Sequence, residues 1–180
     1  MIVLMGVAGV GKSTQGRMLA DQKGYAWIST GEILRVLVTG SRRHEMLQGK
    51  LLTDDEMIKV LSKVFELIDP NDEFVLDGFP RTVVQTDWLI DQAEHHGFSR
   101  IIVLNLYSDR KVVHDRLAER GRADDTEAAI AKRFEEYEKV TMPLVKSFKE
   151  HGIKIYEING DQDPETVHKE IMRVISEDEE

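Results

Sequence analysis

The chain has 180 residues, of which 41% are hydrophobic and 32% charged, the balance of a soluble globular protein with one domain. Acidic residues outnumber basic ones by 33 to 24, and the net charge of −9 argues against nucleic-acid or membrane-surface binding. The absence of cysteine excludes disulfides, cysteine-ligated zinc and a thiol nucleophile.

The first residues, MIVLMGVAG, lack a basic segment, and their apolar run predicts a core strand rather than a secretion signal. No stretch approaches the roughly 18 apolar residues that a membrane span needs. We therefore expect a cytoplasmic protein, and a monomer, because neither a hydrophobic tail nor a coiled-coil pattern is evident.

Strand-like and helix-like runs alternate along the chain. Strands are predicted at 2–6, 25–29, 73–78, 100–107 and 153–159. Helices are predicted at 12–24, 82–96, 109–120 and 163–176, with a helical region at 31–69 and a long helical pattern at 124–151. The closing SEDEE reads as a solvated, frayed end.

This alternation predicts a parallel sheet with helices on both faces. Ligands of such sheets bind beyond the carboxyl ends of the strands. Four candidate motifs follow predicted strands, at 6–13, 29–35, 77–81 and 109–122. Their convergence predicts one shared site.

The first motif, GVAGVGKS, fits the pattern GxxxxGK[ST] between a strand and a helix. Its glycines let backbone N–H groups turn toward an anion, and the helix adds its positive N-terminal end. Lys12 can reach the β- and γ-phosphates of a nucleotide, and Ser13 or Thr14 can hold Mg²⁺ or its water. The alternative is a glycine-rich turn that binds no ligand.

The other strand ends also carry groups suited to phosphate. In DGFPRTVVQ, Asp77 can hold a Mg²⁺ water or hydrogen-bond the first loop, and Arg81 offers a planar fork. In ISTGEILR, Thr30 is predicted to cap a helix, and Arg35 lies one turn further along it. Each stretch could also be an ordinary capped turn.

A cluster of arginines follows the fourth strand: Arg116, Arg120, Arg122 and Arg133. Arg116 and Arg120 share one helix face, where like charges repel unless something anionic lies between them. Such an arrangement suits phosphoryl transfer, which needs positive charge around the moving group. A solvated cluster neutralised by Asp124 and Asp125 is the alternative.

Taken together, these motifs resemble the nucleoside monophosphate kinases, and most closely the adenylate kinases. GVAGVGKSTQ, ISTGEILR, GKLLTDDEMIKVL, DGFPRTVVQ and GRADDTEAAIAKRFEEYEKVTMPLV occur in the family's order over nearly the whole chain. The resemblance implies a three-layer P-loop fold with a five-stranded parallel sheet. It implies one domain, 1–180, with a monophosphate-binding insert at 30–55 and a very short lid at 119–125.

The resemblance also implies Mg²⁺-dependent, reversible phosphoryl transfer from ATP to AMP, with free nucleotides as partners and no zinc. The implied catalytic residues are Lys12, Arg81, Arg120, Arg122 and Arg133. The implied ATP site comprises Gly9, Val10, Gly11, Lys12, Ser13, Thr14, Arg116 and Arg120. The implied AMP site comprises Thr30, Gly31, Arg35, Lys50, Leu51, Leu52, Gly78, Phe79, Pro80, Arg81, Gln85, Arg122 and Arg133. The implied magnesium-binding residues are Ser13, Thr14 and Asp77.

Two side chains bear on the choice of base. Gln85 follows FPR at the spacing where adenylate kinases place a glutamine against adenine, and Thr30 also matches the adenine-selecting members. A kinase of UMP, CMP or several monophosphates is one alternative. A small sugar-acid kinase and a nucleotide-dependent binding protein or ATPase are two others.

Overall fold

The computed structural model describes residues 1–47, 52–69, 72–98, 100–122 and 125–179. Within these ranges five strands form one parallel sheet in the order β2-β3-β1-β4-β5, which confirms the predicted fold class. The strands are β1 (Ile2–Met5), β2 (Ala26–Ser29), β3 (Phe74–Asp77), β4 (Ile102–Tyr107) and β5 (Ile155–Asn159).

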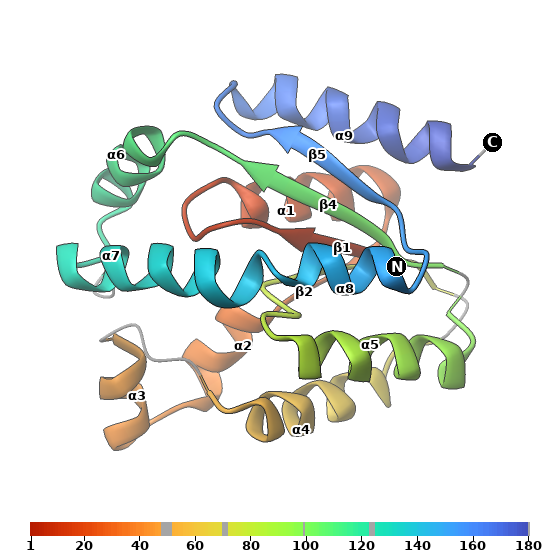
Figure 1. Cartoon of the computed structure of the whole chain (residues 1–180), viewed down its shortest axis with the longest axis horizontal. Helices are drawn as coiled ribbons and strands as arrows, with labels where there is room; N and C mark the ends of the chain where they lie inside the picture. The colour runs from red at the N-terminus through yellow and green to blue at the C-terminus, as the bar shows by residue number, and fades with distance from the viewer. Residues whose placement is uncertain (48–51, 70–71, 99, 123–124, 180) are drawn as a thin grey trace.

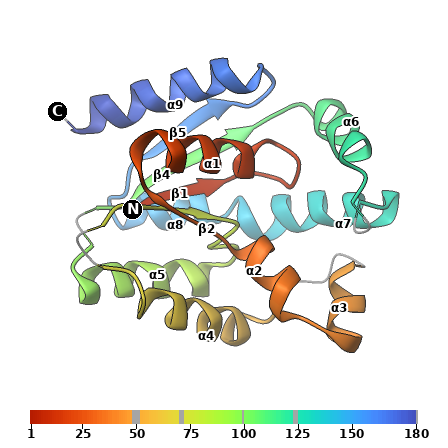
Figure 2. The ribbon, with the colours of Figure 1, turned by 180° about the vertical axis from the view of Figure 1, so that it is seen from behind.

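Helices connect the strands and cover both faces of the sheet (Figures 1 and 2). The helices of the first half are α1 (Lys12–Lys23), α2 (Thr30–Leu37), α3 (Gly40–Leu47), α4 (Asp54–Phe65) and α5 (Val83–His96). Those of the second half are α6 (Arg110–Arg120), α7 (Glu127–Glu136), the π-helix η1 (Tyr137–Thr141), α8 (Leu144–Glu150) and α9 (Pro164–Glu179).

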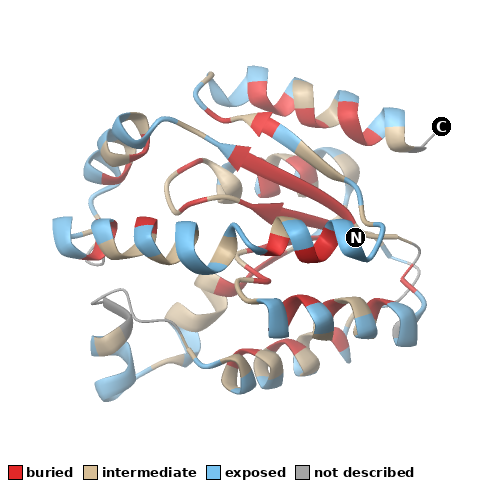
Figure 3. Ribbon diagram, in the orientation of Figure 1, coloured by how far each residue is buried: buried red, intermediate tan, exposed pale blue. Residues whose placement is uncertain are grey.

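The apolar run of β1 explains why the sheet is covered twice. All four of its residues are buried, and side chains alternate between the faces of a strand. Ile2 and Leu4 belong to a core cluster that includes Leu19 of α1 and Ile171 of α9. Val3 belongs to a second cluster, formed with α4, α5 and α8 on the other face. Figure 3 shows the buried strands between these two layers.

The two long helical regions each contain several shorter helices. The region 31–69 contains α2, α3 and α4, because the chain turns extended at Val38 and Gly40 adopts a positive φ of 62°. The region 124–151 contains α7, η1 and α8. Met142 donates to Tyr137 at the end of η1, next to Pro143, which has no N–H to continue the ladder.

The prediction of a frayed C-terminal end is wrong at Asp178. Helix α9 extends to Glu179, and the Asp178 side chain is only 10% exposed. Its carboxylate accepts from Tyr156 Oη (2.6 Å) and Lys154 Nζ (3.1 Å), and it pairs with Arg100 (3.2 Å). Contacts with β5 and the start of β4 therefore hold a tail that looks solvated in isolation.

The order of the strands places a crevice beside β1. The chain leaves β3 on one side of β1 and continues in β4 on the other, which is the switch point where open α/β sheets bind ligands. Asp77, at the end of β3, is in register with Leu4 of β1 and Ser29 of β2. Among the described residues, no helix is long and apolar enough to cross a membrane.

Candidate functional site

A glycine-rich loop joins β1 to α1 at the switch point. Gly6, Gly9 and Gly11 have φ values of 136°, 92° and 112°, which L side chains rarely adopt. Gly11 is the N-cap of α1, and no side chain caps the helix there. The first N–H groups of α1 are thus left for another partner, as in an anion-binding cradle.

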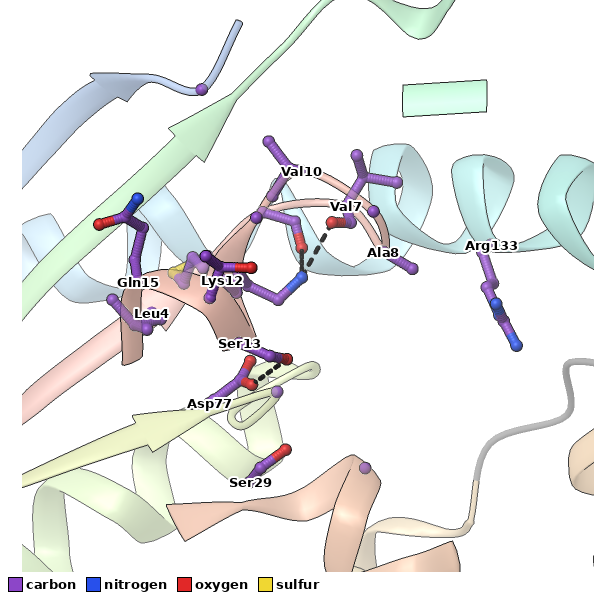
Figure 4. A pocket seen from close by; sticks show the side chains of 18 of the residues that line it. Leu4, Val7, Ala8, Val10, Lys12, Ser13, Gln15, Ser29, Asp77 and Arg133 are labelled. Carbon is purple, nitrogen blue, oxygen red and sulfur yellow. Dashed lines mark hydrogen bonds between the residues drawn. The ribbon is translucent and has the colours of Figure 1, made fainter. Parts of the chain in front are cut away.

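Lys12, the first residue of α1, folds back into this loop. Its Nζ donates to the carbonyl oxygens of Gly6 (2.7 Å) and Val7 (2.9 Å), as Figure 4 shows. Burial lowers the pKa of Lys12 to about 8, with Asp77 working against the shift. The nearby positive charges of Arg81, Arg120 and Arg133 lower this pKa further. A phosphate in their midst would relieve the repulsion.

Two oxygen groups meet beside the lysine. Ser13 Oγ donates to Asp77 Oδ2 at 2.6 Å, so the carboxylate at the end of β3 is tied to the loop after β1 (Figure 4). The prediction that Asp77 hydrogen-bonds the first loop is therefore confirmed. Hydroxyl and carboxylate oxygens are ligands that suit Mg²⁺.

The loop after β3 contributes a half-buried arginine. Arg81 Nε donates to the carbonyl oxygen of Gly78 (2.8 Å), and burial lowers the pKa of Arg81. Gly78 has a φ of 83°, and a Cβ there would lie 2.6 Å from Thr30 Oγ1. Thr30 itself donates to the Asp77 carbonyl oxygen (3.2 Å). Its prediction as a helix cap is wrong: the N-cap of α2 is Ser29.

Two carboxylates hold four further arginines. Asp125, with 1% of its side chain exposed, accepts from Arg120 Nη2 (2.6 Å) and Arg133 Nη1 (3.0 Å). Burial acts to raise the pKa of Asp125, but the two arginines outweigh it and the pKa is lowered. Glu32, on α2, accepts from Arg35 Nη2 (2.7 Å) and Arg122 Nη2 (3.5 Å).

The glycine-rich loop, Lys12, the Ser13–Asp77 pair and the arginines line one cavity of about 820 Å³. Arg133 reaches toward it from α7 (Figure 4). The cavity brings together most of the predicted site residues, namely Gly9, Val10, Gly11, Lys12, Ser13, Thr14, Thr30, Gly31, Arg35, Leu52, Asp77, Gly78, Pro80, Arg81, Gln85, Arg116, Arg120, Arg122 and Arg133.

Among the described residues, one predicted site residue, Phe79, does not line the cavity. Phe79 is 1% exposed, lies in the core and packs edge-on against Trp88, 5.8 Å between ring centroids. Its aromatic side chain is therefore used for packing, whereas its neighbours Gly78 and Pro80 line the cavity. Lys50 and Leu51 lie outside the described residues.

The cavity also includes residues that sequence reasoning missed. Gly160 to Pro164, directly after β5, form part of its wall, and Arg116 Nη1 donates to the Gly160 carbonyl oxygen (2.7 Å). Glu136 and Tyr137 line it as well. Tyr137 Oη donates to Asn105 (2.9 Å), and burial raises the pKa of Tyr137 to about 12. The position of 160–164 after a strand was a usable signal, since the other motifs were found by that rule.

A cradle of this kind, at the switch point of a parallel sheet, defines the P-loop class of phosphate-binding proteins. The adenylate kinase family model matches residues 4–153. Adenylate kinase 1 of Nostoc sp. (strain PCC 7120) is 34% identical over 180 residues, covering 97% of each chain. Adenylate kinases of Prochlorococcus marinus (strain AS9601) and Bacteroides fragilis (strain YCH46) are each 32% identical, over 96% and 97% of both chains. The chain belongs to the adenylate kinase family.

Proposed function

We propose that this protein transfers the γ-phosphoryl group of ATP to AMP, giving two ADP. The observation that carries the proposal is the convergence of cations: Arg81, Arg120 and Arg133, from three parts of the chain, line one cavity with Lys12. Like charges gathered at one place repel one another, and two nucleotides supply several phosphates that offset this repulsion. Family membership supports the same reaction.

We infer a mechanism of positioning and electrostatics, without a covalent enzyme intermediate. The loop N–H groups and Lys12 hold the ATP phosphates. Arg116 holds the neighbouring wall, residues 160–164, by donating to the carbonyl oxygen of Gly160. Thr30, Arg35, Arg81 and Gln85 line the part of the cavity assigned to AMP. An AMP phosphate oxygen attacks the γ-phosphorus, the bond to the ADP oxygen breaks, and Arg120, Arg122 and Arg133 stabilise the developing charge.

Ser13, Thr14 and Asp77 would hold Mg²⁺, partly through water. The fit rests on the Ser13–Asp77 pair, whose hard oxygen atoms line the same cavity as the phosphate loop. When bound there, Mg²⁺ neutralises phosphate charge. Removing it with a chelator is expected to abolish transfer, and adding excess Mg²⁺ to restore it.

We also propose that residues 30–55 and 119–125 form the monophosphate-binding insert and a short lid, which close over the substrates. Residues 48–51 and 123–124 of these segments lie outside the described residues. We further propose a cytoplasmic monomer with free nucleotides as partners. The net charge of −9 supports small ligands that bind in a local basic cavity over nucleic acid.

A coupled assay tests the function. The purified protein is given Mg·ATP with AMP, CMP, UMP or GMP, beside a control without acceptor. We expect ADP formation that requires a monophosphate and is fastest with AMP. Equal rates with several acceptors would favour a broad-specificity kinase, and ADP formed equally without any acceptor would contradict the proposal in favour of an ATPase.

A further inference from the structure

The side-chain amide of Gln85 is held at both ends by the protein. Gln85 is 4% exposed, lies in the first turn of α5 and lines the cavity. Its Oε1 accepts from the backbone N–H of Arg81 (2.8 Å), and its Nε2 donates to Asp54 Oδ1 (2.8 Å).

Each of the two hydrogen-bond partners of the Gln85 amide can take only one role, donor or acceptor. A backbone N–H can only donate, and a carboxylate can only accept. Turning the Gln85 amide over would set its oxygen against the carboxylate of Asp54 and its NH₂ against the Arg81 N–H. The orientation is therefore determined by the chemistry of its neighbours, and one N–H and one oxygen lone pair remain for a ligand.

Asp54 is itself placed firmly enough to fix the amide. It is the first residue of α4, whose start is closed by a capping box between Thr53 and Glu56. Its Oδ1 also accepts from Thr82 Oγ1 (2.8 Å), and Thr82 is the N-cap of α5. The carboxylate thus ties the start of α4 to the start of α5. Asp54 does not line the cavity, and of its two partners Gln85 and Thr82 only Gln85 does.

The orientation of an amide decides which purine it can pair with. Adenine carries a donor, its amino group, at position 6, whereas hypoxanthine and guanine carry an acceptor oxygen there. An amide pairs with adenine in one orientation, and the same orientation sets oxygen or NH₂ against a like group of a 6-oxopurine. Locking the amide therefore selects one kind of purine.

We propose that Asp54 is a positioning residue that fixes the Gln85 amide in its adenine-selective orientation and so rejects 6-oxopurine monophosphates. The inference rests on the proposed function of the same site. It assigns the choice of base to a pair of side chains, one of which never touches the substrate.

The test compares AMP with IMP, which differ in the 6-substituent and the proton on N1. For each variant, kcat/KM is measured with both acceptors at saturating Mg·ATP, and binding of both is measured by calorimetry without ATP. We expect Asp54→Ala to lower the AMP/IMP preference roughly ten-fold, the order of one good bidentate contact. The loss should appear in KM for AMP, with KM for ATP unchanged.

Asp55→Ala is the matched control, because Asp55 is the neighbouring exposed carboxylate in the same helical turn. It should leave the preference within about two-fold. Asp54→Asn keeps the side-chain size and carries the test if Asp54→Ala does not fold. The carboxamide introduced by Asp54→Asn can accept from the Gln85 NH₂ or donate to the Gln85 oxygen, so it permits both orientations of the Gln85 amide. Asp54→Asn should therefore lower the AMP/IMP preference, by a smaller factor than Asp54→Ala.

A double-mutant cycle with Gln85→Ala separates positioning from a general structural role. In the Gln85→Ala background, Asp54→Ala should change the AMP/IMP preference by less than about two-fold. Additive effects, or an unchanged preference in both Asp54 variants, would overturn the inference. A wild-type protein that forms no ADP from AMP would instead overturn the proposed function, and the binding measurements would still decide the role of Asp54.

Discussion

Two pairs of cations line the cavity: Lys12 and Arg81, which we call its floor, and the partly exposed Arg35 and Arg122, which we call its mouth. The two pairs have different hydrogen-bond partners. In the floor, Lys12 donates to the carbonyl oxygens of Gly6 and Val7, and Arg81 to that of Gly78. At the mouth, Arg35 and Arg122 share the carboxylate of Glu32, which is 38% exposed. The hydrogen-bond acceptors of the floor cations are neutral carbonyl oxygens, although the carboxylate of Asp77 is nearby, whereas the acceptor at the mouth carries a full negative charge.

This difference separates a site that is ready for phosphate from one that must be rearranged. Carbonyl oxygens hold a cation in place without cancelling its charge, so the floor keeps its attraction for anions. A carboxylate cancels the charge, and a phosphate that arrives at the mouth must replace it. The floor is therefore preorganised for charge stabilisation, whereas the mouth exchanges one anionic partner for another.

Removing the floor lysine should have the largest effect. Lys12→Ala takes away the cation nearest to the phosphate loop, and we expect transfer from ATP to AMP to fall about 10³-fold, the order seen when one preorganised charge contact is lost. Steady-state ADP formation measures it. Lys169→Ala, an exposed lysine on α9, is the control and should retain full turnover. Near wild-type turnover of Lys12→Ala would contradict a role for Lys12 in stabilising the charge of the phosphoryl group.

Removing the mouth carboxylate should have the smallest effect, and in the opposite direction. Glu32→Gln frees Arg35 and Arg122 from competition, so AMP should bind about two- to three-fold more tightly at low salt. Calorimetry at about 0.02 M and about 0.5 M salt should show the gain disappear at high salt. Glu66→Gln removes another exposed, paired carboxylate at the end of α4 as a control. Weaker AMP binding by Glu32→Gln would mean that Glu32 positions Arg35 instead.

Sequence patterns predicted the features that depend on local rules. The five strands, the loop after β1 and the placement of Asp77 and Arg81 after β3 all follow from apolar runs, glycine spacing and strand ends. The rule that ligands bind at strand ends also brought Arg35 and the later arginines to one cavity.

The features that were missed depend on contacts between distant residues. Asp178 looks solvated in SEDEE, but Tyr156 and Lys154 bind its carboxylate. Thr30 has the composition of a cap, yet its hydroxyl bonds to the carbonyl of Asp77, 47 residues away. The partner of Gln85, Asp54, is 31 residues away. Nothing in any of these three local patterns signals such a partner.

The pKa of Lys12 tests the preorganised floor most directly. It can be followed by the ¹⁵N shift of Nζ during a pH titration, with Lys12→Arg used to assign the signal. We predict a midpoint near 8 in the free protein, against an ordinary value of 10.5, and a higher midpoint with Mg²⁺ and a non-hydrolysable ATP analogue.

The nucleotide should then bind with proton uptake above pH 8, and its affinity should fall as the pH rises through that value. In the same window the unfolded chain holds the proton that the native state has lost, so stability should rise with pH. A midpoint near 10.5 with and without nucleotide would contradict the claim that Lys12 is desolvated in the free protein and is stabilised in its charged form by bound phosphate.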